Sequence, residues 1–292
     1  MHATIVAVTP QLEQWRSDGG NFSHAAGPVF TKSAGSGPDL LFIHGFPTAS
    51  WDWAKIWPSF LPHFRCHTLD MIGFGFSPKP VEFKYSIHAQ ADLFEQVLRS
   101  QNVRETAIIA HDYGDTVAQE LLARHNEGSL CFAIKRMVLL NGGLFPETHR
   151  PLLLQKLLAS PLGSFVARLS TYRQFAANMR RICARPLTDD ECQAMWQLMH
   201  GNNGLAVLPK LIGYMEERRQ FRARWVGALQ ESIVPIRLIN GVDDPISGAH
   251  MVARYRELIP NPDIVALPGV GHYPQVEAAE DVVAAAMGFL RG

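Results

Sequence analysis

Residues 106–124 read Thr106-Ala-Ile-Ile-Ala-His-Asp-Tyr-Gly-Asp-Thr-Val-Ala-Gln-Glu-Leu-Leu-Ala-Arg124, an apolar run typical of a buried strand followed by a helix-forming stretch. Between the two lies the pentapeptide Ala110-His-Asp-Tyr-Gly114, in which small residues flank a central side chain. This pattern is typical of a nucleophile elbow, and Asp112 stands where G-x-S-x-G enzymes have serine. Small residues are needed at Ala110 and Gly114 because the strained turn brings neighbouring backbones into close contact.

An aspartate at this position changes the expected chemistry. A carboxylate is ordinarily ionised at neutral pH. It can therefore displace a leaving group from a saturated carbon and form an alkyl ester without a base to activate it. An aspartate in a strand-to-helix turn can also be a simple helix N-cap, so the rest of the chain must distinguish between the two roles of Asp112.

Strand-like and helix-like segments alternate along most of the chain. Strands are predicted at 28–32, 39–44, 63–70, 104–111, 135–140, 236–240 and 263–267, and helices at 51–61, 86–100, 248–258 and 277–290. This alternation is typical of an α/β fold with a mostly parallel central sheet flanked by helices.

Between residues 144 and 228 the pattern predicts helices only. One is expected at 192–200, opened by the capping box Thr188–Glu191, and another at 205–219 with Pro209 in its first turn. We therefore predict a core domain of residues 1–143 and 229–292 with an inserted all-helical cap of residues 144–228. Such an insertion would cover the carboxyl ends of the strands, where open α/β sheets bind ligands.

The composition is that of a globular protein with balanced charge. Of 292 residues, 47% are hydrophobic, and 27 lysines and arginines match 27 aspartates and glutamates. This balance predicts neither a nucleic-acid partner nor an anionic membrane partner, and we interpret the cluster Arg218, Arg219, Arg222 and Arg224 as a solvated helix face. Residues 1–11 lack a basic leader segment, and no stretch reaches about 18 apolar residues. We expect no membrane span and a cytoplasmic location.

No cofactor and no metal are expected. The glycine-rich turn at 73–77 lacks the Lys-Ser/Thr pair of phosphate-binding loops, and no dinucleotide fingerprint accompanies it. The four cysteines, Cys66, Cys131, Cys183 and Cys192, have no CxxC spacing, so reduced thiols are favoured over disulfides or a metal site.

The partners of a nucleophile elbow follow in the expected order. After the strand at 236–240 come Asp243 and Asp244, of which Asp244 is favoured because it directly precedes a proline. After the strand at 263–267 comes His272, a glycine-flanked loop histidine suited to be the general base that the acid orients. Earlier in the chain, the backbone N–H of Phe46 could converge with that of Tyr113 as an oxyanion hole.

Five motifs together identify a resemblance. They are His44-Gly-Phe-Pro47, Gly73-Phe-Gly-Phe-Ser77, His111-Asp-Tyr-Gly114, Gly241-Val-Asp-Asp-Pro245 and Gly271-His272. This set resembles the α/β-hydrolase fold, in the aspartate-nucleophile branch that contains epoxide hydrolases and haloalkane dehalogenases. Residues 111–122, 141–157 and 221–229 are most similar to the mesoderm-specific transcript protein group, and the similarity covers nearly the whole chain. It implies a hydrolase with Asp112 as nucleophile, His272 as base and Asp244 as orienting acid.

The resemblance also bears on the substrate. Epoxide hydrolases protonate the departing oxygen with two cap tyrosines, for which Tyr214 and Tyr172 are the candidates. Tyr214 shares a helix face with Val207 and Leu211, so we expect it to point inward. Dehalogenases hold halide with a tryptophan after the nucleophile, where this chain has Tyr113, which also differs from the tryptophan usual in epoxide hydrolases.

The resulting prediction is an enzyme that hydrolyses a small apolar epoxide, or a related electrophile, to a vicinal diol, with water as the second reactant. The alternatives are a haloalkane dehalogenase, a carboxylesterase-like hydrolase and, least favoured, a non-catalytic binding protein.

Overall fold

The structure is a computed structural model in which residues 9–292 are described. Residues 1–8, which contain most of the segment examined for a leader, lie outside the described residues. The described residues form an eight-stranded sheet with the strand order β1-β2-β4-β3-β5-β6-β7-β8. Its strands are β1 (Gly20–His24), β2 (Gly27–Gly35), β3 (Asp39–Ile43), β4 (Arg65–Leu69), β5 (Glu105–His111), β6 (Ala133–Leu140), β7 (Ile236–Gly241) and β8 (Asp263–Leu267).

The sheet is mostly parallel, as the sequence predicts. Only the pairs β1–β2 and β2–β4 are antiparallel, and every pair from β4 to β8 is parallel. All seven predicted strands are present. β1 was not predicted because Gly20-Asn-Phe-Ser-His24 is a polar edge strand without a buried apolar run.

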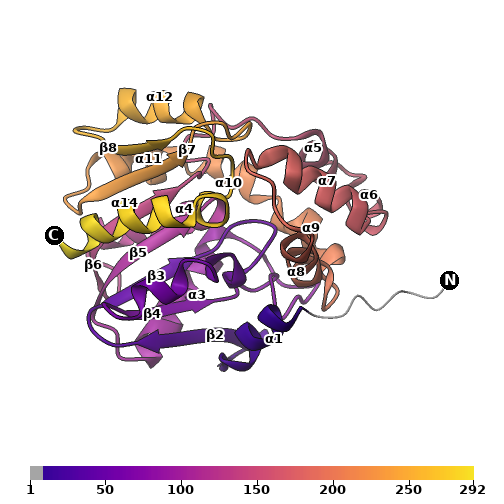
Figure 1. Cartoon of the computed structure of the whole chain (residues 1–292), viewed down its shortest axis with the longest axis horizontal. Coiled ribbons are helices and arrows are strands. Elements are labelled where there is room, and N and C mark those ends of the chain that lie inside the picture. The colour runs from indigo at the N-terminus through magenta and orange to yellow at the C-terminus, as the bar shows by residue number, and fades with distance from the viewer. Residues whose placement is uncertain (1–8) are drawn as a thin grey trace.

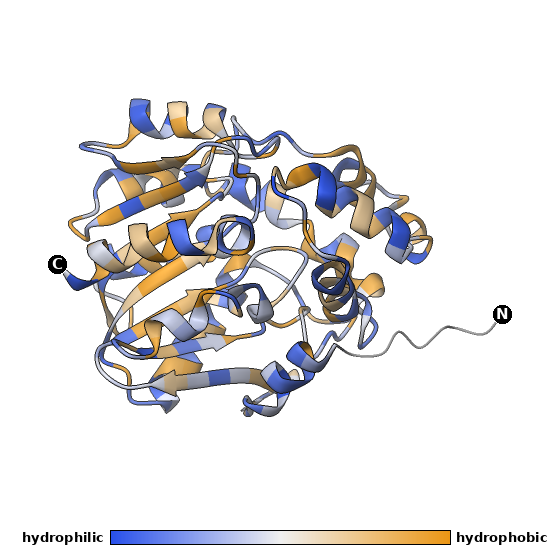
Figure 2. Cartoon of the chain, in the orientation of Figure 1, coloured by the Kyte–Doolittle hydropathy of each residue, from blue (hydrophilic) through white to orange (hydrophobic). Residues whose placement is uncertain are grey.

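Helices of the core flank this sheet on both faces (Figure 1). They are α1 (Pro10–Ser17), the 3₁₀ helix η1 (Ser50–Trp53), α2 (Trp57–Phe60), α3 (Ile87–Ser100), α4 (Tyr113–Asn126), α12 (Ala249–Leu258), α13 (Pro274–Glu277) and α14 (Ala279–Arg291). The helix predicted at 51–61 is thus divided into η1 and α2. The central strands are largely hydrophobic (Figure 2), as strands covered on both faces must be.

The insertion between β6 and β7 is helical, as predicted. It comprises α5 (Leu153–Leu158), α6 (Gly163–Arg168), α7 (Tyr172–Ile182), α8 (Asp189–His200), α9 (Gly204–Leu211), α10 (Tyr214–Gln220) and α11 (Arg222–Gln230). The capping box of α8 is present, because the Thr188 side chain accepts from the Glu191 N–H and Glu191 Oε2 accepts from the Thr188 N–H.

The single helix predicted at 205–219 is wrong. The segment forms α9 and α10, which are separated at residues 212–213, and Pro209 lies inside α9 beyond its first turn. Proline has no N–H to donate to the preceding turn and its ring disfavours continuation of a helix. The helix ends at Leu211, two residues after Pro209, and Gly213 directly precedes Tyr214, the first residue of α10.

Most of the inserted helices lie at one end of the sheet, whereas α11 lies along it (Figure 1). Trp225 in α11 donates from its indole nitrogen to Glu120 Oε2 in α4 over 2.8 Å, and Gln119 donates to the Trp225 carbonyl. The last inserted helix therefore packs in the layer of α4, and the predicted boundary between residues 228 and 229 passes through it. The exact domain limits stay a prediction.

No helix within residues 9–292 combines the length and apolar character needed to cross a bilayer. The four cysteines are free thiols, three of them buried, which agrees with the prediction of reduced cysteines.

A buried lysine fastens the cap to the core. Lys79 Nζ donates to the carbonyl oxygens of Gly75 in the core, at 2.8 Å, and of Leu198 and Gly201 at the end of α8, at 2.8 and 2.6 Å. Its side chain is buried, and so are Gly75 and Leu198, so loss of the ammonium group would leave their carbonyls without a donor.

We predict that Lys79→Met lowers the free energy of unfolding by about 2–4 kcal/mol, because methionine keeps the aliphatic stem and removes the charged donor. Urea denaturation of this variant should be compared with that of Lys84→Met, which changes an exposed lysine. Equal stability of the two variants would contradict the assigned role of Lys79.

Candidate active site

The strand-to-helix turn predicted at Asp112 is strained. Asp112 has φ 50° and ψ −106°, a backbone conformation that residues other than glycine rarely adopt. The turn is held by its neighbours: the Asp112 N–H donates to the Leu140 carbonyl over 3.1 Å, and α4 begins directly after it. Gly114 must lack a side chain, because a Cβ atom there would lie 2.3 Å from the carbonyl oxygen of Ile43.

The turn after β3 approaches the carboxylate of Asp112. The Phe46 N–H donates to Asp112 Oδ2 over 3.1 Å, and the Phe46–Pro47 peptide bond is cis. Tyr113 is the first residue of α4, where the N–H groups have no acceptor within the helix. The two backbone donors expected to form an oxyanion hole thus belong to segments that meet at Asp112.

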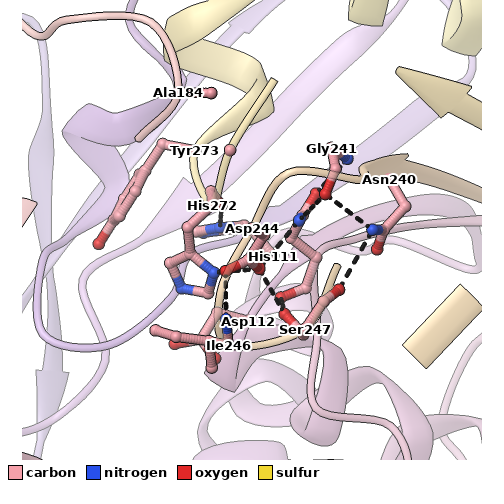
Figure 3. Close-up of polar contacts among 12 residues, drawn as sticks. His111, Asp112, Ala184, Asn240, Gly241, Asp244, Ile246, Ser247, His272 and Tyr273 are labelled. Carbon is pink, nitrogen blue, oxygen red and sulfur yellow. Dashed lines mark hydrogen bonds and ion pairs between the residues drawn. The ribbon is translucent and has the colours of Figure 1, made fainter. Parts of the chain in front are cut away.

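His272 and Asp244 form a buried, hydrogen-bonded pair (Figure 3). The His272 Nδ1–H donates to Asp244 Oδ2 over 2.8 Å. The same oxygen accepts from Asn141 Nδ2 at 3.0 Å and from Ser247 Oγ at 2.7 Å, while Oδ1 accepts from the Ile246 N–H at 2.7 Å. With its carboxylate fixed in this way, Asp244 sets the orientation of the imidazole and leaves Nε2 for other partners.

The alternative acid, Asp243, points elsewhere. It is exposed, and its Oδ2 accepts a hydrogen bond from the Gly269 N–H. Asp244 is therefore the aspartate that contacts His272.

The carboxylates around His272 control its protonation. Burial alone would lower its pKa, but the charges of Asp244 and Asp112 outweigh burial and raise the pKa to about 9. Burial likewise opposes ionisation of Asp244, yet the interaction with His272 and the donors around it lower the pKa of that carboxyl to about 2. The imidazole is thus a cation in the resting state at neutral pH.

The loop that carries His272 is joined to the cap. The His272 N–H donates to the Ile182 carbonyl at the end of α7 over 2.9 Å. Glu277 Oε2 accepts from the N–H of Gly271 in this loop, at 2.9 Å, and from the N–H of Ala184 in the cap, at 2.7 Å. The position of the imidazole therefore depends on the core and on the inserted helices.

Arg218 is the site residue that the sequence interpretation missed. It was placed on a solvated helix face, but its side chain is only 3% exposed. Its Nη2 donates to the Asp112 carbonyl over 3.0 Å and lies 3.8 Å from Asp112 Oδ1, and its Nε donates to Thr116 Oγ1 over 2.7 Å. A signal was present in the sequence, because Arg218 follows the inward-pointing Tyr214 by four residues and so shares its helix face.

The other arginines of that cluster form ion pairs. Arg222 pairs with Glu147, Arg224 with Glu120 and Glu127, and Arg219 with Glu216. Of the four, only Arg218 is buried beneath the carboxylate of Asp112.

The two cap tyrosines occupy different environments. Tyr214 is buried with its ring against Phe46 and Tyr113, the guanidinium of Arg218 lies 4.5 Å from the centre of that ring, and its hydroxyl has no hydrogen-bond partner in the described part of the chain. Tyr172 is half-exposed, and its hydroxyl donates to Asp189 Oδ1 over 2.7 Å. The structure brings Tyr214 to the site and does not bring Tyr172 there.

Asp112 and His272 line the same cavity, whose volume is about 420 Å³. Phe46 and Ile246 join them from the core, and most of the wall comes from the cap, from α5 to α9. The wall is largely aliphatic and aromatic, with a few polar side chains such as Gln174 and Asn178. Tyr214 is not among the lining residues, but its ring packs against that of Phe46, which is.

No group of three or more histidine, cysteine, aspartate or glutamate side chains within residues 9–292 is arranged to hold a metal ion. His111 and His44, which lie close to the site, are engaged in packing the turns. His111 Nε2 donates to the His272 carbonyl over 2.8 Å, and His44 Nε2 accepts from the Met71 N–H.

A strained elbow, a histidine–aspartate pair after the last strands and a helical cap over the sheet define an α/β hydrolase. The model of the Alpha/beta hydrolase family matches residues 40–286, and the chain belongs to this family. It is 38% identical to the mesoderm-specific transcript protein of Mus musculus, over 99% of this chain and 91% of that protein. It is also 38% identical to the putative hydrolase LipZ of Mycobacterium tuberculosis, over 97% of this chain and 99% of that one.

A solved structure shows the same fold at low sequence identity. The haloalkane dehalogenase DbeA from Bradyrhizobium elkani superposes with a TM-score of 0.75 and 20% identity, over 91% of this chain and 94% of that one. The resemblance to the mesoderm-specific transcript protein group, which the motifs indicate, is confirmed by the 38% identity over 99% of this chain.

The raised pKa of His272 predicts a pH-dependent stability. The pKa is about 9 in the folded protein and about 6.5 in an unfolded chain. The stabilisation is therefore complete below about pH 6.5 and is lost as the pH rises through about 9. The free energy of unfolding, measured in urea at fixed pH values, should fall with rising pH and fall less steeply in His272→Gln. The exposed His63→Gln is the control, and equal slopes for wild type and His272→Gln would contradict the prediction.

Proposed function

We propose that this protein hydrolyses an electrophile at a saturated carbon through an alkyl ester on Asp112, with an epoxide as substrate and a vicinal diol as product. The observation that carries the proposal is the carboxylate of Asp112, which accepts a hydrogen bond from the Phe46 N–H and faces the same apolar cavity as His272. A serine hydrolase would need the histidine to activate its nucleophile, whereas a carboxylate needs no such help.

In the first step the bonds exchange at the substrate carbon. Oδ1 of Asp112 is the attacking oxygen, because Oδ2 is engaged by Phe46. A new bond joins Oδ1 to the carbon, the carbon–oxygen bond of the ring breaks, and the departing oxygen takes a proton from an acid. Tyr214 is the proposed acid, because it is buried against Phe46, a lining residue of the cavity, and the charge of Asp112 acts on its hydroxyl. A rotation of the Phe46 ring would open this hydroxyl to the substrate.

In the second step water cleaves the ester. His272 Nε2 takes a proton from water, and the hydroxide adds to the carbonyl carbon of the Asp112 side chain. The negative charge develops on Oδ2, which the Phe46 and Tyr113 N–H groups stabilise. Collapse of this intermediate breaks the bond between the carbonyl carbon and the diol oxygen, which takes a proton back from His272. The proton of the added hydroxyl passes to the Tyr214 phenolate, so the diol leaves and the carboxylate is restored with one oxygen atom from water.

The charges of the site support this order of steps. In the resting state the Asp112 carboxylate helps to raise the pKa of His272. Esterification removes that negative charge while Arg218 remains positive beside it, so the pKa of His272 falls. The imidazolium then releases its proton to solvent, and the neutral imidazole can act as a base until the carboxylate is restored and the proton is taken up again. The base thus becomes available when its ester substrate is formed.

Removal of the base should trap the ester. We predict that His272→Gln lowers turnover by about 10²–10⁴-fold, because general base catalysis is typically worth that factor. The enzyme should accumulate with substrate covalently attached to Asp112, which intact-protein mass spectrometry would detect as a mass increase equal to that of the epoxide.

The control for this experiment is Asp112→Asn, which should form no adduct and show no turnover. A panel of an epoxide, a bromoalkane and a p-nitrophenyl ester distinguishes the alternatives, because each releases a different product. Continued hydrolysis of the epoxide by Asp112→Asn would exclude the covalent mechanism, and turnover of the bromoalkane or ester alone would exclude the epoxide.

The tyrosine pair offers a matched comparison. Tyr214→Phe should lower epoxide turnover by on the order of 10²-fold, as expected for loss of a general acid, and should leave ester hydrolysis nearly unchanged. Tyr172→Phe, which loses only the contact with Asp189, should turn over both substrates like wild type. Equal epoxide turnover in the two variants would rule out Tyr214 as the acid.

A further inference from the structure

The cap contains a segment with a positive net charge, although the net charge of the whole chain is zero. Residues 150–188 contain seven lysines and arginines and no aspartate or glutamate. The seven are Arg150, Lys156, Arg168, Arg173, Arg180, Arg181 and Arg185. The whole chain has net charge 0, so the remainder carries an equal excess of acidic residues.

Most of these cations are free. Arg180 pairs with Asp189, and Arg185 lies 3.7 Å from Asp281. The other five are exposed and form no ion pair with a side chain of residues 9–292. Since a paired charge is largely neutralised, these five carry the positive field of the cap.

Large apolar side chains are exposed on the same segment. Leu153 is 70% exposed, Leu162 63%, Phe165 64% and Leu169 58%, and Leu157 is also exposed. Only Val81 and Ile233 are further exposed large apolar residues in the described part of the chain. Helices α5 to α7 form one outer corner of the molecule, where hydrophobic and hydrophilic segments alternate (Figures 1 and 2).

This apolar surface is continuous with the cavity. Leu157, Phe165 and Leu169 are exposed and also line the cavity that contains Asp112 and His272. Leu153 lies between two lining residues, Leu152 and Leu154. Three of the five exposed apolar residues thus belong to the cavity wall, and the unpaired cations lie on the same segment of the chain.

We propose that the face formed by residues 150–173 of α5, α6 and the start of α7 binds the surface of an anionic phospholipid bilayer, with the cavity mouth toward the lipid. Apolar side chains inserted at the headgroup level together with lysine and arginine are the features of peripheral membrane binding. A nucleic acid would account for the cations and leave the four leucines and Phe165 in water. This proposal revises the expectation, drawn from total charge, that no anionic membrane is a partner.

The apolar surface also indicates a class of substrate, and this inference rests on the proposed function. A cavity with an aliphatic wall that opens onto lipid would take a long-chain, membrane-dissolved electrophile directly from the bilayer. Such a substrate is scarcely present in water, so membrane binding would supply it to Asp112.

Vesicle flotation tests the binding itself. The full chain should float with vesicles of phosphatidylcholine and phosphatidylglycerol, and not with phosphatidylcholine alone, at about 0.15 M salt. Arg168→Gln/Arg173→Gln should lower the partition coefficient by about tenfold or more, since each cation near such a surface contributes about 1 kcal/mol. Leu153→Ser/Leu162→Ser, which leaves the cavity wall intact, should lower it similarly.

Two control variants match these changes elsewhere on the surface. Arg104→Gln/Arg256→Gln removes two exposed cations outside the cap, and Val81→Ser/Ile233→Ser removes two exposed apolar side chains. Both should float like wild type. Absence of wild-type binding, or equal loss in test and control variants, would overturn the proposal.

The competing occupants give different results. If the cap variants lose RNA binding in a gel-shift assay while no protein floats, the face binds nucleic acid and the proposal is wrong. If they convert a dimer to a monomer in size-exclusion chromatography and no protein floats, the face is a subunit interface and the proposal is again wrong.

The binding test is independent of catalysis. Asp112→Asn should float like wild type, so flotation without epoxide turnover would refute the proposed function and leave the membrane surface standing. With turnover established, Leu153→Ser/Leu162→Ser should lose about tenfold on a long-chain epoxide in vesicles and retain wild-type rates on a short soluble epoxide. Equal loss on both would refute the lipid substrate class.

Discussion

One buried carboxylate in a strained turn organises the site. Asp112 has a positive φ and is almost fully buried, and neither condition is favourable in isolation. Its surroundings compensate: the Phe46 N–H donates to the side chain, and Arg218 donates to the carbonyl and places a positive charge near Oδ1. With His272 protonated and Asp244 ionised, two positive and two negative charges share the centre.

The site is built from the core and the inserted helices, although the elbow belongs to the core. The cap supplies Arg218 and most of the cavity wall, and it holds the loop of His272 through the Ile182 carbonyl. Glu277 fixes that loop and the cap segment with the same carboxylate oxygen. Lys79 provides a second buried connection, from the core to the end of α8. Cap and chemistry are therefore coupled by hydrogen bonds as well as by shape.

The proposed membrane surface and the proposed reaction both depend on the apolar residues of the cavity wall. An apolar wall excludes water from the carboxylate, which strengthens each electrostatic contact at the centre. Some residues of this wall, Leu157, Phe165 and Leu169, are also exposed, and they lie on the segment that carries the unpaired cations. A soluble, polar substrate would not require such an entrance.

The local patterns of the chain were sufficient to predict the sheet, the elbow and the order of Asp112, Asp244 and His272, because strands, tight turns and caps depend on neighbouring residues. The same reasoning failed at Pro209, inside one of two short helices, and at Arg218, which was assigned to solvent. Total charge also hid the cationic cap. Which cap side chains enter the site, how Tyr172 and Tyr214 differ, and where the cavity opens all follow from packing between segments more than 100 residues apart in some cases, as for Arg218 and Thr116. Those contacts depend on how the inserted helices pack against the rest of the protein, and only the tertiary structure specifies that packing.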